Sequence, residues 1–175
     1  LIGKRSGVEY GSIVTGVNEP VGPIDTEDPL LYVNTLVYRL AWHIMATPNL
    51  AYEYSGRVNE LQSKHDADLA NGFDVGALRL DGDRTGDGVV PSASQAYGDI
   101  LGVFASDHLD CVGHFPHTTS NDVEVSGWVR SGAGFTSERF ELLWGRVAEY
   151  IAKSVGKTVA AKGSRRIRLV GDATS

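Results

Sequence analysis

Residues 75–110 read VGALRLDGDRTGDGVVPSASQAYGDILGVFASDHLD, and this stretch carries the main signals for the architecture of the chain. The apolar runs Val75–Leu80 and Ile100–Ala105 are typical of strands that are buried on both faces of a sheet. The first run leads into a turn that carries Asp87, and His108 follows the second run. Buried strands that alternate with helices predict an α/β fold with a mostly parallel sheet.

The segments before this stretch predict another strand and two helices. Val8–Val17 has the β-branched and aromatic residues of a short strand. Apolar residues recur at helical spacing over Pro29–Ala46, and Pro48 is expected to stop this amphipathic helix. A more polar helical stretch is expected around Tyr52–Lys64. The apolar positions of the amphipathic helix are Leu30, Val33, Val37, Leu40, Ala41 and Ile44.

A long helix is predicted near the C-terminal end. Thr136 is its expected N-cap, and Phe135 and Phe140 stand at the spacing of a hydrophobic staple. Gly156 is expected to close this helix, and a short strand is predicted before it at Val123–Val125. The side expected to face the sheet consists of Phe140, Leu143, Trp144, Val147 and Ile151. No linker or repeat divides the chain, so residues 1–175 are predicted to form one folding unit.

Composition excludes several classes of protein. The 175 residues suffice for the core of one ordinary domain, and 42% hydrophobic with 22% charged residues is a globular composition. A net charge of −6 argues against a nucleic-acid partner. No apolar run approaches the roughly 20 residues of a transmembrane helix. Cys111 is the only cysteine, which excludes a disulfide framework and a cluster of thiolate ligands.

Asp87 and His108 have the placement of a catalytic acid and base. Asp87 lies on a glycine-bounded turn, Gly86-Asp87-Gly88, and His108 lies on the loop after the next strand. In a nucleophile–His–Asp triad, the acid holds one tautomer of the imidazole so that its other nitrogen can take the proton of the nucleophile. We therefore expect the Asp87 carboxylate within about 2.6–3.2 Å of His108 Nδ1. No G-x-S-x-G nucleophile elbow occurs in the 175 residues.

Other interpretations of these segments remain open. Asp81, Asp83, Thr85 and Gly86 have the spacing of an EF-hand calcium loop, although Ser92 stands where such a loop needs a glutamate. The same residues also suit a polar turn that serves only backbone geometry.

Further candidates lie near His108 and elsewhere. Asp107 and Asp110 flank His108 and compete with Asp87 for the role of the acid. Cys111 is interpreted either as a nucleophile or, more simply, as a small buried side chain. Structural roles are expected for the remaining histidines, His43, His65, His114 and His117.

The segments GDGVVP at 86–91 and DHLD at 107–110, with a strand between them, resemble the acid and histidine segments of bacterial lipases and related esterases of the α/β-hydrolase fold. Those families show Asn-Asp-Gly and two apolar residues, followed after a strand by Asn-His-Leu-Asp. The resemblance implies that Asp87 is the acid and His108 the base. Gly86 and Asp107 depart from the pattern, because each replaces the usual asparagine.

The resemblance implies that residues 1–175 are the C-terminal half of one α/β-hydrolase domain, with a helical cap insertion at about 24–66. A segment or companion chain that bears the nucleophile would then lie outside these 175 residues, and the substrate would be an ester or a lipid. Secretion is favoured by the same resemblance. The helix Pro29–Ala46 is interpreted either as part of the cap or as a core helix packed on the sheet.

The resemblance also implies a structural calcium ion. Asp110 matches one calcium ligand of the calcium-dependent lipases, and Asp66 or Asp68 stands near the place of the second acidic ligand, while His114 replaces the later glutamine ligand. No other cofactor is expected. The leading hypothesis is thus a lipase-like or esterase-like serine hydrolase. The alternative is a non-catalytic α/β binding or interaction module, with calcium binding as one form of it.

Overall fold

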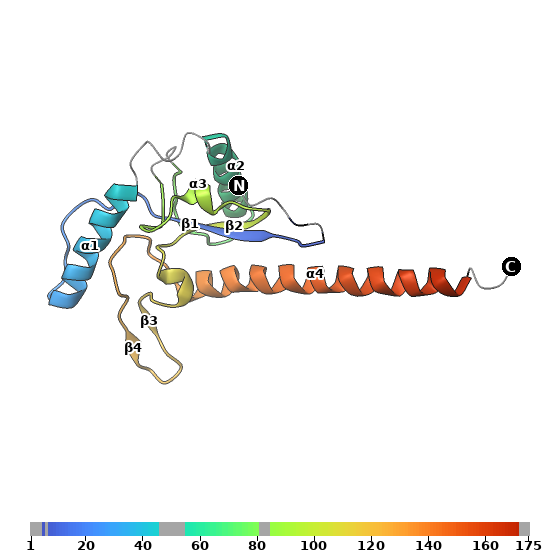
Figure 1. Ribbon diagram of the computed structural model, residues 1–175. Helices are drawn as coiled ribbons and strands as arrows, with labels where there is room; N and C mark the ends of the chain where they lie inside the picture. Colours follow the sequence, from blue (N-terminus) through green and yellow to red (C-terminus); the bar gives the residue numbers. More distant parts are fainter. Residues whose placement is uncertain (1–4, 6, 46–54, 81–84, 172–175) are drawn as a thin grey trace.

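The computed structural model describes residues 5, 7–45, 55–80 and 85–171. Along the chain, the first half contains β1 (Gly11–Gly16), α1 (Pro29–Met45) and α2 (Ser55–Ala70). The second half contains α3 (Ser92–Gln95), β2 (Asp99–Ala105), a single 3-10 turn η3 (Asp110–Val112), β3 (His117–Thr118), β4 (Glu124–Val125) and α4 (Ser137–Gly171) (Figure 1). The order is that of an α/β protein, as predicted.

The centre of the structure is a two-stranded parallel sheet. β1 pairs with β2 from Gly11 opposite Asp99 to Gly16 opposite Ala105, with a register shift between Ser12 and Ile13. The second pair of strands, β3 and β4, forms a small antiparallel hairpin. The described part of the chain therefore contains a parallel sheet, but a smaller one than the sequence predicts.

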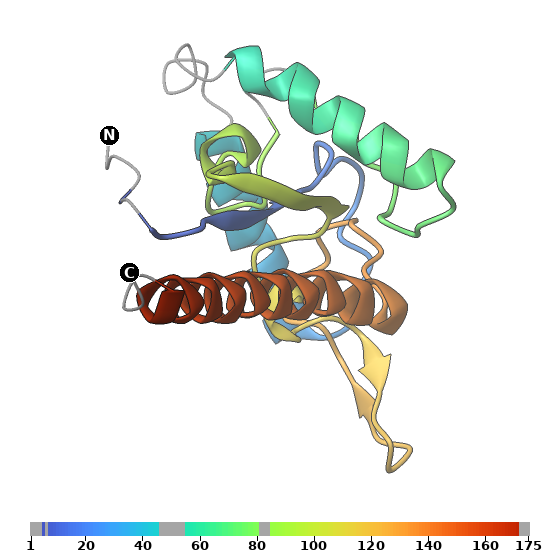
Figure 2. The ribbon, with the colours of Figure 1, turned by 90° about the vertical axis from the view of Figure 1, so that its right-hand side faces the viewer.

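Helices α2 and α4 cover opposite faces of this sheet (Figure 2). Alternation along the strands explains the two layers, because neighbouring residues of a strand point to opposite faces. Val14 and Val103 pack with Leu61 of α2 in one core cluster. Phe104 packs with Leu143 of α4 in the other.

The amphipathic helix α1 begins where it was predicted and packs by a different face. Asp28 caps it, since its Oδ1 accepts hydrogen bonds from the main-chain N of Leu30 and Leu31 at 2.9 and 3.3 Å. Tyr38 and Trp42 are its buried core residues. The predicted apolar stripe is largely exposed on the other side of the helix, where Leu30, Val33, Val37, Leu40 and Ile44 are each at least half exposed. Leu36, which the prediction did not include, is exposed as well. Ala46 and Pro48 lie outside the described residues.

The prediction of a strand at Val75–Leu80 is wrong, although the burial of the segment is as expected. Gly76 has a φ of +77°, which interrupts an extended strand, and Ala105 N donates to Val75 O at 2.8 Å as an isolated bond. The side chain of Asn18 bonds Ala77 O and Arg79 N at 3.0 and 2.9 Å. A side-chain amide thus takes the place of a neighbouring strand.

The long helix α4 has the predicted start and a different end. Thr136 Oγ1 accepts a hydrogen bond from Arg139 N at 3.3 Å, as expected of an N-cap. The helix does not close at Gly156 but continues to Gly171, well beyond the sheet (Figure 1). Two residues of its predicted buried side are exposed, Trp144 by 47% and Ile151 by 57%.

The second helix and the strand β4 lie close to their predicted positions. A helix is present at Ser55–Ala70, where the polar helical stretch was predicted, while Tyr52 lies outside the described residues. The strand predicted at Val123–Val125 corresponds to β4. Within the described ranges, no helix has both the length and the apolar character needed to cross a membrane.

The orientation of α1 predicts unequal effects of two substitutions. Trp42 is 6% exposed and donates from Nε1 to Val17 O at 3.3 Å, whereas Leu40 is 62% exposed. We expect Trp42→Ala to lower the free energy of unfolding by about 3 kcal/mol. Leu40→Ala should change it by less than about 0.5 kcal/mol. Urea unfolding followed by circular dichroism measures both, and equal effects would contradict the orientation.

Candidate active site

Asp87 and His108 are in direct contact. His108 Nδ1 lies 2.9 Å from Asp87 Oδ2, within the range expected from the sequence. The side chain of Asp87 is 3% exposed, whereas that of His108 is 47% exposed. Among the residues that the structure describes, Nε2 of His108 has no hydrogen-bond partner. A buried carboxylate thus holds one nitrogen of an imidazole whose other side is open.

The acid is held by its own turn. Val89 N and Val90 N donate to Asp87 Oδ1 at 3.0 and 2.8 Å, and Asp87 N donates to Val90 O at 3.2 Å. The main chain also connects the acid to the base, because His108 N donates to Asp87 O at 2.9 Å. With Oδ1 occupied by the turn, Oδ2 is left to face the imidazole.

Gly88 is required in this turn for two reasons. Its φ of +92° lies in the left-handed region, which residues other than glycine rarely adopt. A Cβ atom at this position would also lie 2.1 Å from a ring carbon of Tyr38 on α1. The glycine therefore permits both the shape of the acid turn and the close approach of α1.

Two residues that the sequence analysis missed also contact the acid. Thr15 Oγ1 donates to Asp87 Oδ2 at 3.0 Å, and Gln95 Nε2 lies 3.3 Å from the same oxygen. Thr15 is buried near the end of β1, beside the buried Val14. The one signal in the sequence that could have indicated Thr15 is a hydroxyl side chain within an apolar strand segment. Gln95 gave no such signal, because it lies in the short segment before β2.

The loop that carries His108 is held by two interlocked carboxyl groups. Asp107 Oδ1 accepts hydrogen bonds from Leu109 N and Asp110 N at 2.8 and 3.0 Å, and Asp110 Oδ2 accepts one from Asp107 N at 3.0 Å. Both carboxyl groups therefore bind main-chain groups of their own turn. Of the three neighbouring acids, it is Asp87 that contacts the imidazole.

Burial changes the acidity of this pair. Asp107 and Asp110 are 1% and 4% exposed. Desolvation raises the pKa of both groups, and the charge of Asp107 raises the pKa of Asp110 further, to about 8. Burial and the neighbouring charge thus favour the protonated form of Asp110.

The side chains of the implied calcium site do not form a metal-binding cluster within the described residues. Calcium takes six to eight oxygen ligands, and the described ranges contain no group of three or more acidic, histidine or cysteine side chains placed to hold a metal. Asp68 is paired with Arg146 and Lys64 at 2.6 and 2.9 Å, and Asp66 is 63% exposed on the same helix. Asp110 is engaged in its own turn. Asp81 and Asp83 of the EF-hand interpretation lie outside the described residues.

Cys111 does not have the character of a nucleophile. Its Sγ donates to His108 O at 3.3 Å, which is a main-chain oxygen and not an imidazole nitrogen. Burial raises the pKa of this thiol to about 11, and the negative charges of Asp87, Asp107 and Asp110 contribute in the same direction. The interpretation as a small, partly buried side chain is the one that fits.

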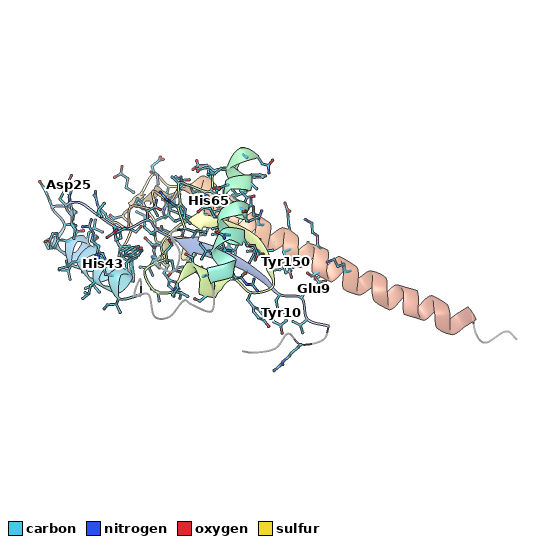
Figure 3. The ribbon with its side chains drawn as sticks, turned by 90° about the horizontal axis from the view of Figure 1, so that it is seen from above. Glu9, Tyr10, Asp25, His43, His65 and Tyr150 are labelled. Atoms are coloured by element: carbon cyan, nitrogen blue, oxygen red, sulfur yellow. The ribbon has the colours of Figure 1, made fainter. Side chains whose placement is uncertain are left out.

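The other histidines make structural contacts. His65 on α2 is buried, and its Nε2 lies 2.8 Å from Gly76 O. His43 lies near the end of α1 rather than on α2 (Figure 3), and its ring is edge-on to that of Trp42. His117 Nδ1 bonds Phe115 O at 2.7 Å, and His114 stacks on Trp128. These contacts agree with the roles expected from the sequence.

A cavity of about 720 Å³ reaches Asp110, two residues after His108, while His108 and Asp87 do not themselves line it. It is lined by Asp110, by Leu31 of α1 and by residues of the segment 116–135. Pro116, Val129 and Phe135 give its walls apolar surface. A small molecule with an apolar part would fit a cavity of this size.

The pKa of Asp110 predicts a stability that falls as the pH rises. A carboxyl whose pKa is raised on folding binds its proton more tightly in the folded chain. Its contribution is complete below its ordinary pKa of 3.8 and is lost as the pH rises to about 8. Asp110→Asn cannot ionise and keeps an oxygen for Asp107 N. We therefore expect this variant to exceed the unsubstituted protein in stability at about pH 8.5 by more than roughly 1.4 kcal/mol, the equivalent of one pKa unit.

Thermal unfolding at a series of pH values measures this difference, which should shrink toward about pH 4. Asp25→Asn is the matched control, because Asp25 is exposed. A gap between Asp110→Asn and the unsubstituted protein that does not depend on pH would show that the carboxyl is not protonated in the folded chain.

Comparisons of the chain with protein-family models, with curated proteins and with solved structures found no match. The Asp87–His108 contact and its surroundings are therefore the features of this chain that indicate a function.

Proposed function

We propose that this chain supplies the acid and the base of a serine-type carboxylic ester hydrolase similar to bacterial lipases and esterases. In this proposal His108 is the general base and then the general acid, and Asp87 orients it. The attacking serine and its oxyanion hole belong to a segment or companion chain outside these 175 residues. The chain would then be the C-terminal half of an α/β-hydrolase domain.

The observation that carries the proposal is the 2.9 Å contact between a buried carboxylate and a half-exposed imidazole. When Asp87 Oδ2 accepts the proton of Nδ1–H, the neutral imidazole has its lone pair on Nε2. Nε2 can then take the proton of a serine hydroxyl and return it to the leaving alcohol. The nearby negative charge stabilises the imidazolium that forms between these two steps.

The comparison with His65 separates this arrangement from a structural histidine. His65 is 1% exposed, and its Nε2 bonds a main-chain oxygen. His108 has a carboxylate on one nitrogen and exposure on the other side of the ring, which is the geometry that proton transfer needs.

The position of the pair also supports the proposal. His108 follows β2, and Gly86 next to the acid accepts a hydrogen bond from Val17 N, directly after β1, at 2.9 Å. Both groups therefore lie at the carboxyl ends of parallel strands, where open α/β sheets bind their ligands.

An ester with an apolar acyl or alcohol part is the substrate class that the surroundings favour. The cavity beside Asp110 has apolar walls, and α1 contributes Leu31 to it. The exposed apolar side of α1 also suits a cap that contacts an apolar substrate. The cap of the proposed hydrolase would include this helix and extend over about 24–66.

The second candidate is a non-catalytic α/β binding module that uses the same cavity. It is favoured by one observation, since the 175 residues contain no nucleophile elbow. A binding module would hold a ligand in the cavity without any need for the imidazole of His108, so substitution of this residue distinguishes the two.

Ester hydrolysis by the native protein, expressed with its flanking coding sequence, tests the proposal. With p-nitrophenyl butyrate as substrate, we expect His108→Ala to abolish turnover. Asp87→Asn should lower kcat by on the order of 10³–10⁴, because the amide favours the wrong imidazole tautomer. The isolated 175-residue chain should give no turnover above background.

His114→Ala is the control, because His114 packs against Trp128 and lies outside both the proposed cap and the lining of the cavity. It should retain full activity. Robust turnover by the isolated chain, or undiminished turnover by His108→Ala in the native protein, would contradict the assignment.

A further inference from the structure

Gln95 replaces a neighbouring strand at the outer edge of β1. Thr15 N donates to Gln95 Oε1 at 2.7 Å, and Gln95 Nε2 donates to Thr15 O at 3.1 Å. A side-chain amide thus makes the same pair of bonds with Thr15 that the main chain of another strand would make. Ser92 Oγ adds a third bond to this edge, to Thr15 O at 2.7 Å.

The same amide reaches the acid turn. Gln95 Nε2 lies 3.2 Å from Val90 O and 3.3 Å from Asp87 Oδ2. Thr15 Oγ1 donates to the same Asp87 oxygen at 3.0 Å. The edge of β1, the end of α3 and the acid turn therefore meet at one carboxylate.

The donors around Asp87 are divided between its two oxygens. The main-chain amides of Val89 and Val90 occupy Oδ1. Oδ2 faces Thr15 Oγ1 and Gln95 Nε2 in addition to His108 Nδ1. The hydroxyl hydrogen of Thr15 is shared with Gln95 Oε1 at 3.1 Å, and the two amide hydrogens of Gln95 are shared among Oδ2, Thr15 O and Val90 O. A carboxyl group bound on both oxygens cannot rotate without breaking charge-assisted hydrogen bonds. Its second oxygen is consequently fixed toward the imidazole.

We infer that Gln95 and Thr15 are positioning residues that set the direction and strength of the hydrogen bond from His108 Nδ1–H to Asp87. The inference rests on the proposed function, in which this bond selects the imidazole tautomer. Neither residue contacts the imidazole, and each acts through Oδ2 of the acid. The donor hydrogen of the Gln95 amide is the essential group, together with the hydroxyl hydrogen of Thr15.

Two isosteric substitutions isolate these hydrogens. Gln95→Glu keeps an oxygen for Thr15 N but removes the donor and places a second carboxylate against Asp87. Thr15→Val removes the hydroxyl and keeps the size of the side chain. Thr15→Ser is the conservative variant that retains the hydroxyl, and it should behave as the unsubstituted protein does.

Gln62→Glu is the matched control for the change of charge. Gln62 also accepts a main-chain hydrogen bond, from Leu80 N at 2.8 Å, and also donates to an aspartate, Asp66, at 2.7 Å. Its partner aspartate is on α2 and is not the acid of the site. A general effect of losing a partly buried amide would appear in both glutamate variants, whereas an effect through Asp87 would appear only in Gln95→Glu.

Proton NMR of the full 175-residue chain measures the bond without any need for turnover. The Nδ1–H of an imidazole bound to a carboxylate resonates far downfield, and loss of the signal in His108→Gln assigns it. We expect Gln95→Glu and Thr15→Val to shift this resonance upfield or to abolish it. Gln62→Glu and Thr15→Ser should leave it in place. In the native protein, Thr15→Val should lower kcat by on the order of tenfold at unchanged KM, since binding groups are untouched.

The outcomes separate the inference from the proposed function. A resonance that Asp87→Asn leaves unchanged would overturn the Asp87–His108 bond and with it the proposed function. A resonance that responds to Asp87→Asn but not to Gln95→Glu or Thr15→Val would overturn only the positioning role. If Gln95→Glu does not fold, Gln95→Met gives the same comparison, because it is of similar size and lacks both the donor and the charge.

Discussion

The carboxylate of Asp87 is the group on which the arrangement of this site depends. A carboxylate that is 3% exposed is costly to bury unless hydrogen bonds satisfy it. Its donors come from four separate parts of the chain: its own turn, Thr15 of β1, Gln95 of α3 and His108 after β2. These parts must lie side by side for the acid to be buried at all. The fold and the site therefore stabilise each other.

The same carboxyl end of the sheet also receives α1. Trp42 of this helix donates to Val17 O, and Tyr38 lies against Gly88 in the acid turn. The acid turn is thus enclosed between the sheet and α1, which explains how Asp87 becomes buried at the end of only two strands. Because these contacts use one side of α1, its apolar stripe is left on the surface. The burial of the acid and the exposure of that stripe have a common cause.

The sequence predicted those parts whose signals are local. A few neighbouring residues suffice to predict the turn at Gly86–Gly88, the position of His108 after a buried strand and the cap at Thr136. The turn and the histidine together predict the contact of Asp87 with His108. Val75–Leu80 could not be assigned correctly, because an apolar run shows burial but not which groups satisfy the main chain; here Asn18 does so from a distance. Trp144 is 47% exposed and donates from Nε1 to Cys111 O in the η3 turn at 3.1 Å, a contact that helical periodicity does not contain. The role of Gln95 could not be predicted either, because its contacts with Thr15 and Asp87 exist only in the tertiary structure.

Asp107 stands where the lipase pattern has an asparagine, and this difference changes the charge of the His108 loop more than its shape. Asp107 Oδ1 accepts hydrogen bonds from Leu109 N and Asp110 N, and the side-chain oxygen of an asparagine can accept the same two bonds. The turn that presents His108 is therefore compatible with either residue. The aspartate adds a buried negative charge next to Asp110, and after burial itself this charge is the main reason that the pKa of Asp110 is raised. Burial and this charge together favour the protonated form of Asp110, while the main-chain bonds of Asp107 keep the shape of the loop that presents His108.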